Sequence, residues 1–363
     1  MSTSTYRNKL RPVYQQLREQ DGKKLKQVHP SLWLDKALEN QKNENSQLVK
    51  EVATIAMPEI YPHVYTAWKR QLLQADIRVQ PIQATSRIII GLGNESVLET
   101  GISLHHTYGV PYLPGSALKG LAASYAHQQL QHDWIKGGEL HRILFGDTNN
   151  AGFITFLDAW YIPPEEPEPM LYQDVMTVHH PMYYRNEPGA APTDSDSPTP
   201  IPFVSTGGCY LLALAAPDLP DLKEKDPWLQ ATWRILEQAL QRVGIGAKTS
   251  SGYGRMKFLR TPEEEALRQK EIEQQKLLQQ EMEEQHKAQM LADTLANLPP
   301  ESRNEKRSEY YNHWRALRSQ SPKLLLGQAI LLYIPAGNPK KNKRPEDDKD
   351  YQEVRIYVEE QSK

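Results

Sequence analysis

The order of apolar segments between residues 82 and 259 restricts the fold of this chain more than any other feature. The segments alternate between β-branched runs, which predict strands, and runs with helical spacing. The predicted strands cover residues 82–92, 153–162, 203–215 and 255–259. One predicted helix begins at Pro114-Gly115-Ser116, and the other covers residues 227–243. Strand–helix–strand, repeated once, predicts an α+β fold with a ferredoxin-like (RRM-like) core, in which two helices cover one face of an antiparallel sheet.

Three regions lie outside this pattern. Residues 1–80 predict a helical N-terminal lobe, in which Ser31 caps a helix starting at Leu32 and Pro62 opens another. A stretch rich in Pro, Ser and Asp near residues 186–200 predicts a disordered insertion in the core domain, which covers residues 81–260. Residues 261–363 predict a charged helix followed by a C-terminal extension.

The composition narrows the class of protein. The single cysteine, Cys209, excludes a disulfide framework and a cysteine zinc cluster, and it fits a reducing cytoplasm. No apolar run reaches the length of a membrane span, and the first residues lack the apolar region of a signal peptide. The formal charge of −2 predicts that any nucleic acid is bound through a local patch, or together with other subunits.

The strongest local motif is a glycine-rich segment between the second predicted helix and the last strand, and it reads GIGAKTSSGYGR. Its glycines, hydroxyls and unopposed positive charges suit a sugar–phosphate backbone. The residues expected to contact RNA here are Gly244, Gly246, Lys248, Thr249, Ser250, Gly252, Tyr253, Gly254 and Arg255. Ala247 before Lys248 excludes a Walker loop, and Thr249 stands where a dinucleotide fingerprint needs glycine. A purely structural turn stays open as an alternative.

Two further features carry possible chemistry. Lys119, in the first turn of the helix that begins near Ser116, indicates an anion at that helix start. The pairs His105–His106 and His179–His180 could act in RNA cleavage or bind a metal, but neighbouring strand residues point to opposite faces. We therefore predict that His180 and Tyr184 stack on RNA bases. We predict no catalytic residue, no metal and no cofactor.

Three segments, in this order, resemble the RAMP superfamily of CRISPR-associated proteins: LETGISLHHTYGVPYLPGSALKG, DVMTVHHPMYY and GIGAKTSSGYGR. Within it they are most similar to the family of sixth-numbered subunits of the type III-B (Cmr) effector complex. The resemblance covers about residues 80–260. The N-terminal lobe, the insertion and the C-terminal extension depart from it.

The resemblance implies a non-catalytic subunit that binds guide RNA (crRNA) near its 3′ side and serves antiviral defence in the cytoplasm. It implies as partners the guide, its paired target RNA, a backbone RAMP subunit and a small helical subunit, with no membrane. It places Lys119 and residues 244–255 toward the guide, and cleavage on a neighbouring subunit. Two alternatives remain, a metal-independent RAMP endoribonuclease acting on CRISPR RNA and a protein-interaction scaffold that binds no RNA.

Overall fold

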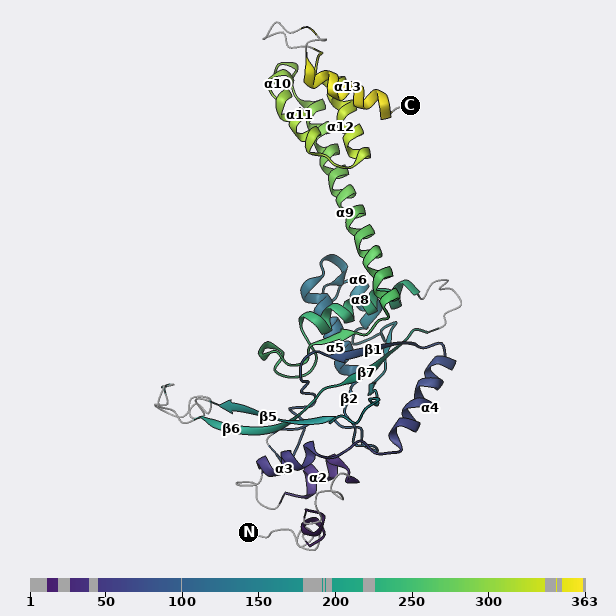
Figure 1. The fold of residues 1–363 in the computed structure, drawn as a ribbon. Coiled ribbons are helices and arrows are strands. Elements are labelled where there is room, and N and C mark those ends of the chain that lie inside the picture. The colour runs from purple at the N-terminus through teal and green to yellow at the C-terminus, as the bar shows by residue number, and fades with distance from the viewer. Residues whose placement is uncertain are drawn as a thin grey trace. The chain divides into compact units, whose positions relative to one another are not determined.

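The chain forms two compact units, Met1–Leu259 and Arg260–Lys363, each with its own hydrophobic core (Figure 1). The computed structural model describes residues 12–18, 27–38, 45–98, 100–178, 191, 193, 198–217, 226–336, 344 and 348–361. Among these residues, no helix combines the length and the apolar character needed to cross a membrane.

The first unit is built on a mixed arrangement of helices and an antiparallel sheet, which confirms that coarse prediction. The strands are β1 (Arg78–Ala84), β2 (Tyr112–Leu113), β3 (Thr155–Phe156), β4 (Ala159–Tyr161), β7 (Cys209–Ala215) and β8 (Met256–Phe258). They lie in the order β2-β4-β7-β1-β8, and β3 also pairs with β7. The main helices, α5 (Gly115–Gln129) and α8 (Asp226–Arg242), connect β2 to β3 and β7 to β8 along the chain.

Helices cover both faces of this sheet. Trp233 of α8 meets Phe258 of β8 edge-on, with ring centroids 5.9 Å apart. Trp68 of α4 (Tyr61–Gln74) stacks on Trp160 of β4 at 4.5 Å. The pairing register puts Phe258 and Trp160 on opposite faces, because successive strand residues point to opposite sides. Helices α8 and α4 therefore enclose the sheet from two sides, as Figure 1 shows.

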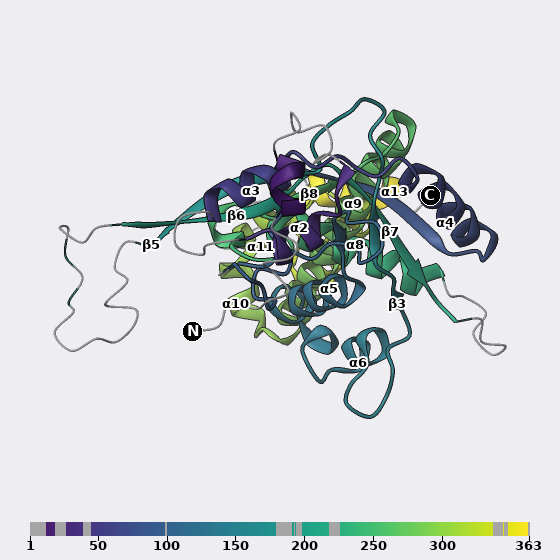
Figure 2. The same ribbon diagram turned by 90° about the horizontal axis from the view of Figure 1, so that it is seen from below.

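A second sheet of two long antiparallel strands, β5 (Leu171–Val178) and β6 (Thr199–Thr206), projects from the body of this unit (Figures 1 and 2). Helix α3 (Asn45–Ala53) lies against both of its strands and also contacts α2 (Pro30–Lys36). Trp33 of α2 is fully buried, and its indole N–H donates to Glu51 of α3 at 2.9 Å. Buried side chains of α2, α3 and α4 share one hydrophobic cluster with the sheet.

The predicted strands are the elements that the structure corrects most. The strand expected over residues 82–92 is β1, which begins at Arg78 and ends at Ala84. Within residues 85–90 the apolar part is Ile88-Ile89-Ile90, which is buried without belonging to a strand, and only Ile88 forms an isolated bridge, to Thr206. The run at 203–215 is two strands, separated where Gly208 has a φ of 79°. The run at 153–162 likewise divides into β3 and β4.

The predicted helices of the core are confirmed, whereas some N-terminal details are wrong. Helix α5 begins at Gly115, and α8 starts one residue before its predicted position. Ser31 is not a cap, because α2 begins at Pro30 with His29 as its N-cap residue and no side-chain cap bond. Strand β6 takes the last two residues of the expected insertion, and residues 186–190, 192 and 194–197 lie outside the described residues.

The second unit is helical. It contains α9 (Pro262–Asn297), α10 (Pro300–Glu305), α11 (Arg307–Ala316), α12 (Gln320–Tyr333) and α13 (Lys349–Gln361). Helix α9 starts with a capping box, in which the Thr261 side chain accepts from the Glu264 N–H and Glu264 accepts from the Thr261 N–H. Its last turns pack on the other helices in a core that contains Tyr311, Trp314 and Leu326.

Candidate nucleic-acid interface

The glycine loop, residues 244–255, is held in place by backbone hydrogen bonds. The N–H of Ile245 donates to the Gly254 carbonyl at 2.9 Å, which closes the loop on itself. The N–H groups of Ala247 and Gly254 donate at 2.8 Å to the carbonyls of Ile89 and Arg87. Those acceptors belong to the bridging segment, which we define as residues 85–90. The loop is therefore docked along this segment rather than free in solution.

The four glycines of the loop have positive φ angles, but they do not serve the same purpose. A Cβ atom at Gly246 would stand 2.2 Å from the Ile89 carbonyl oxygen, and one at Gly254 would stand 2.1 Å from the Ile245 oxygen. A Cβ at Gly244 would stand 2.9 Å from the Gly254 oxygen, whereas one at Gly252 would meet nothing within 4 Å. At three positions the missing side chain makes room for the protein's own backbone, and only Gly252 borders open space.

The tip of the loop exposes unpaired backbone donors. Lys248 has left-handed backbone angles (φ 56°, ψ 35°) and precedes a single 3-10 turn, Thr249–Ser251. Among the described residues, no acceptor bonds the N–H groups of Lys248, Thr249 or Ser250. Lys248, Ser250 and Gly252 are exposed. Successive free N–H groups in such a turn form a concave site for an anion, and the Lys248 ammonium adds a positive charge.

Arg255 ends the loop and joins it to the sheet. Its N–H donates to the Ser86 hydroxyl at 3.0 Å, and its carbonyl accepts from the Thr85 N–H at 2.8 Å. The side chain is half-buried, and its Nη1 group is buried without an acceptor among the described residues. A buried donor left unpaired costs about 1–3 kcal/mol, so an oxygen ligand at this nitrogen would be favoured.

Tyr253 connects the loop to the hairpin base, which we define as residues 171–174 of β5 and 203–206 of β6. Its ring lies 6.2 Å from that of Phe203 in β6. Burial raises the pKa of Tyr253, and the nearby Asp174 carboxylate raises it further, so the phenol stays protonated near neutral pH. His180 and Tyr184, which were predicted to stack on bases, lie outside the described residues.

Arg87 was missed by the sequence reasoning. Its guanidinium carbon lies 3.9 Å from the centroid of the Tyr172 ring, and its Nη1 lies 3.6 Å from Oδ2 of Asp174. Tyr172 and Asp174 belong to β5, far from Arg87 in sequence. Nothing in the residues next to Arg87 signals that pairing, so only the fold reveals it.

Lys119 is the fifth residue of α5, just after the first turn in which it was predicted, and a carboxylate of the protein itself lies at that helix start. Oδ1 of Asp158 accepts the Gly115 N–H at 2.7 Å, and this carboxylate compensates the positive end of the helix dipole. Lys119 itself is half-buried. No contact in the described part of the chain joins it to the glycine loop.

Of the two histidine pairs, His105 and His106 belong to the described residues and lie in different surroundings. His105 is packed among aromatic rings, 4.8 Å from Tyr108 and 5.1 Å from Trp160, and its Nδ1 accepts from the Thr107 N–H. Desolvation by burial lowers the pKa of His105, so its imidazole is neutral at pH 7. His106 is exposed. The described residues contain no group of three His, Cys, Asp or Glu side chains that could hold a metal ion.

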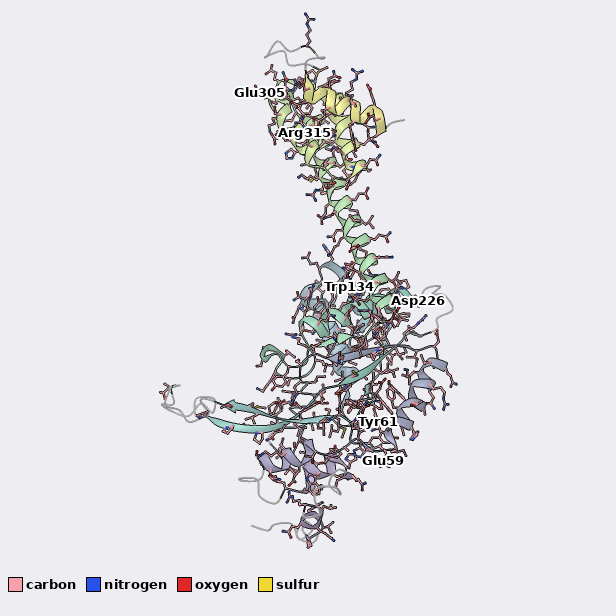
Figure 3. The ribbon with its side chains drawn as sticks, in the orientation of Figure 1. Glu59, Tyr61, Trp134, Asp226, Glu305 and Arg315 are labelled. Atoms are coloured by element: carbon pink, nitrogen blue, oxygen red, sulfur yellow. The ribbon has the colours of Figure 1, made fainter. Side chains whose placement is uncertain are left out.

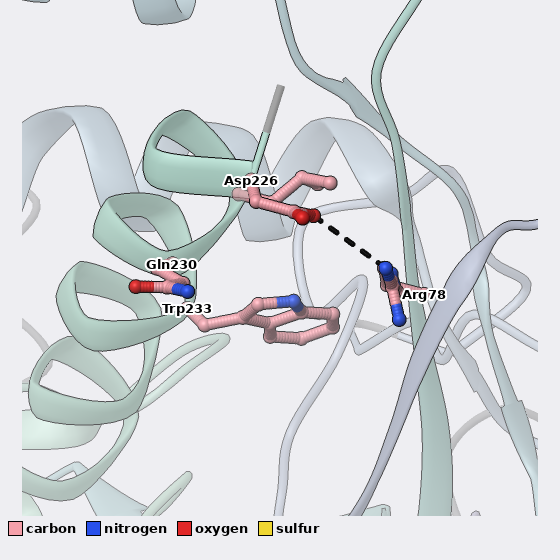
Figure 4. Close-up of a pocket in the computed structure, with 5 residues that line it drawn as sticks. Arg78, Asp226, Gln230 and Trp233 are labelled. Carbon is pink, nitrogen blue, oxygen red and sulfur yellow. Dashed lines mark hydrogen bonds and ion pairs between the residues drawn. The ribbon is translucent and has the colours of Figure 1, made fainter. Parts of the chain in front are cut away.

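An open pocket of about 260 Å³ lies at the starts of β1 and α8, and Figure 4 shows its lining. Arg78 and Asp226 face each other across it with an N–O distance of 3.5 Å, above the Trp233 ring. Both charged side chains are more than half exposed. Their charges offset each other, so this pocket offers no net charge to an RNA backbone.

The glycine loop, the bridging segment and the hairpin base all fall within or beside the part of the chain that matches a known family. Residues 81–257 match the profile of the RAMP superfamily. The CRISPR system Cmr subunit Cmr6 of Pyrococcus furiosus is 29% identical over 255 residues, which cover 54% of this chain and 73% of the relative. Cmr6 of Saccharolobus solfataricus is 30% identical over 103 residues, 27% of this chain and 33% of the relative.

Two solved structures are similar to part of this chain, both with TM-scores below 0.5. The cryo-EM structure of the type III-B Cmr-beta complex bound to cognate target RNA contains a chain with a TM-score of 0.47 and 18% identity, covering 59% of this chain and 70% of its own length. The crystal structure of Cmr6 from P. furiosus gives a TM-score of 0.33 and 26% identity, covering 50% and 98%. The chain thus matches the RAMP superfamily over residues 81–257 and is similar in sequence to the Cmr6 subunits of CRISPR systems.

Proposed function

We propose that this chain is a non-catalytic guide-RNA (crRNA)-binding and assembly subunit of a type III-B Cmr effector complex, near the 3′ side of the guide, in antiviral defence. The RAMP domain and the similarity to Cmr6 subunits support the place in such a complex. The observation that carries RNA binding is the tip of the glycine loop, where nothing in the described part of the chain accepts from three successive N–H groups and where Lys248 is exposed.

The proposed fold of the RNA-binding core is ferredoxin-like. Along the chain, α5 lies between β1 and β4, and α8 lies between β7 and β8. In the sheet these four strands lie in the order β8-β1-β7-β4. Both orders match a β-α-β-β-α-β unit and support this fold. The proposed partners are the guide, the paired target RNA, a backbone RAMP subunit and a small helical subunit. A cytoplasmic place of action follows from those partners.

The loop suits a phosphate for two separate reasons. Its backbone donors are fixed in direction by the bonds to Ile89 and Arg87, so little ordering entropy is lost when an anion binds. Contacts from backbone N–H groups and lysine to phosphate oxygens carry no base information, which is what a subunit needs if it must accept guides of any sequence. The hydroxyls of Thr249 and Ser250 lie in the same turn and can donate to the same oxygens.

The charge of Lys248 should determine part of the salt dependence of RNA binding. Lys248→Gly removes the ammonium but suits the left-handed backbone, so the loop keeps its shape. We expect weaker binding of single-stranded RNA and a slope of log affinity against log salt that is flatter by about 0.7. The measurement is a binding titration of the full chain at several salt concentrations.

Lys270→Ala is the matched control, because it removes one exposed lysine from α9 in the other unit. It should bind RNA like the wild type, with an unchanged slope. If Lys248→Gly folds normally and retains both the affinity and the slope of the wild type, the glycine loop is a structural turn and the proposal loses its main support.

The chain alone should leave single-stranded RNA intact, with or without divalent metal. The physical reason is that His105 is packed and neutral, and no acid or lysine is bonded to it in the described structure. Gel analysis of labelled RNA after prolonged incubation checks this. Cleavage that disappears in His105→Phe, which keeps an aromatic ring in the cluster, or in His106→Ala would replace the proposal with a metal-independent RAMP endoribonuclease.

A further inference from the structure

Arg87 is held by a ring and by an ion pair, and in the described structure neither contact uses its hydrogen-bond donors. Its guanidinium lies 3.9 Å above the Tyr172 ring, a distance at which the cation and the ring face attract each other. Its approach to Asp174, at 3.6 Å, is an ion pair that is too long for a hydrogen bond. Within the described structure no acceptor takes a hydrogen from this guanidinium, and the side chain is 43% exposed. Arg87 therefore presents oriented donors to the surface.

The orientation of Arg87 is set by the hairpin base. Asp174 is itself held by the Ser205 hydroxyl, which donates to Oδ2, the oxygen that faces Arg87. Tyr172 and Ser205 are a cross-strand pair in the β5–β6 register. The ring that stacks on Arg87 and the hydroxyl that holds Asp174 therefore come from adjacent strands. A long flexible side chain that is already ordered in this way loses little entropy when a ligand binds.

Arg87 also lies beside the glycine loop. Its carbonyl accepts the Gly254 N–H, and two residues further on Ile89 accepts the Ala247 N–H. On its other side, the bridging segment is bonded through Ile88 to Thr206 of β6. The charges of Arg87 and Asp174 both affect the Tyr253 phenol, which places all three groups near one another. The glycine loop is thus bonded directly to the backbone of Arg87 and Ile89, and its Tyr253 lies near the Arg87 guanidinium.

We propose that Arg87, oriented by Tyr172 and Asp174, is a second phosphodiester-binding site, which contacts the same RNA strand as the glycine loop where that strand passes the base of the hairpin. The inference rests on the proposed function. A planar guanidinium with free N–H groups matches the oxygens of a phosphodiester. Asp174 acts against the ligand electrostatically while it positions the arginine.

The test measures binding of a labelled oligouridine strand to the full chain at several salt concentrations, with melting curves of each variant. Arg87→Ala should weaken binding about tenfold, as expected for a lost charge-assisted hydrogen bond, and flatten the salt slope by about 0.7. Arg87→Lys keeps the charge but not the planar fork, so it should keep the slope and lose part of the affinity.

Asp174→Asn separates a ligand site from a structural ion pair. Asparagine can still accept from Ser205, and the loss of the carboxylate charge should strengthen RNA binding. If Arg87 only fastens the hairpin, Asp174→Asn leaves binding unchanged or weakens it, and that result overturns the inference.

The inference and the proposed function fail in different ways. A wild-type chain that does not bind the strand defeats the proposed function. A wild-type chain that binds, loses affinity in Lys248→Gly and is unaffected by Arg87→Ala defeats the Arg87 site alone.

Discussion

Replacing Gly246 by alanine is expected to destabilise the Met1–Leu259 unit by about 3 kcal/mol or more, from backbone strain and a steric clash together. The added Cβ would stand 2.2 Å from the Ile89 oxygen, and Gly246 has a φ of 89°. The loop can relieve the clash only by moving away from the bridging segment, which breaks the bond from the Ala247 N–H to that same oxygen. The effect on RNA binding should follow from this loss of structure.

Gly252→Ala is the matched comparison in the same loop. Its φ of 91° also disfavours a side chain, but nothing lies within 4 Å of the added atom. Only the strain of left-handed backbone remains, about 1–2 kcal/mol. The difference between the two variants therefore isolates the steric contact with Ile89.

Tryptophan fluorescence during thermal unfolding checks this pair of substitutions in the full chain. Trp314 belongs to the Arg260–Lys363 unit, and the other six tryptophans of the chain belong to the Met1–Leu259 unit, so the signal reports mainly on the latter. Each kcal/mol should shift the midpoint by about 2–4 °C in a domain of this size. Equal midpoints for Gly246→Ala and Gly252→Ala would contradict the docking of the loop on the bridging segment.

Breaking the buried ion pair of the C-terminal unit should have an effect of similar size there. The side chains of Arg307 and Asp348 are only 6% and 8% exposed and form a direct ion pair. Arg307 also donates to the side-chain oxygen of Asn304 and to the Tyr311 hydroxyl. Arg307→Met leaves the Asp348 charge buried without its partner, which costs about 3–5 kcal/mol. For a unit this small, that is a large part of its total stability.

Arg315→Met provides the control for this second prediction. Arg315 forms ion pairs with Asp350 and Glu353, but all three side chains are between 39% and 49% exposed (Figure 3 labels Arg315). Water screens such pairs, so the loss should stay within about 1 kcal/mol. Hydrogen exchange of peptides from α11 and α12, read by mass spectrometry, measures both effects in the intact chain. Equal protection in the two variants would show that the Arg307–Asp348 pair is not a buried anchor of this unit.

The sequence by itself determined the elements whose signals are local. Helix α5 is marked by Pro114-Gly115-Ser116, because the residues of a helix start are neighbours in the chain. The Thr261–Glu264 capping box of α9 is a local signal of the same kind, although the sequence reasoning did not use it. The glycine loop could be located for the same reason. Its positive φ angles require glycine within a few residues of one another.

The tertiary structure alone decided which residue does what in the candidate site. Gly246 and Gly252 look alike in sequence, and they differ only because the Ile89 carbonyl, from a distant segment, lies against one of them. The apolar run at Ile88 predicted a strand, because burial under neighbouring segments selects the same residues as a sheet does. Arg87 acquires its proposed role from Tyr172 and Asp174 in β5. Contacts between residues this far apart depend on the whole arrangement of strands, so no short stretch of sequence encodes them.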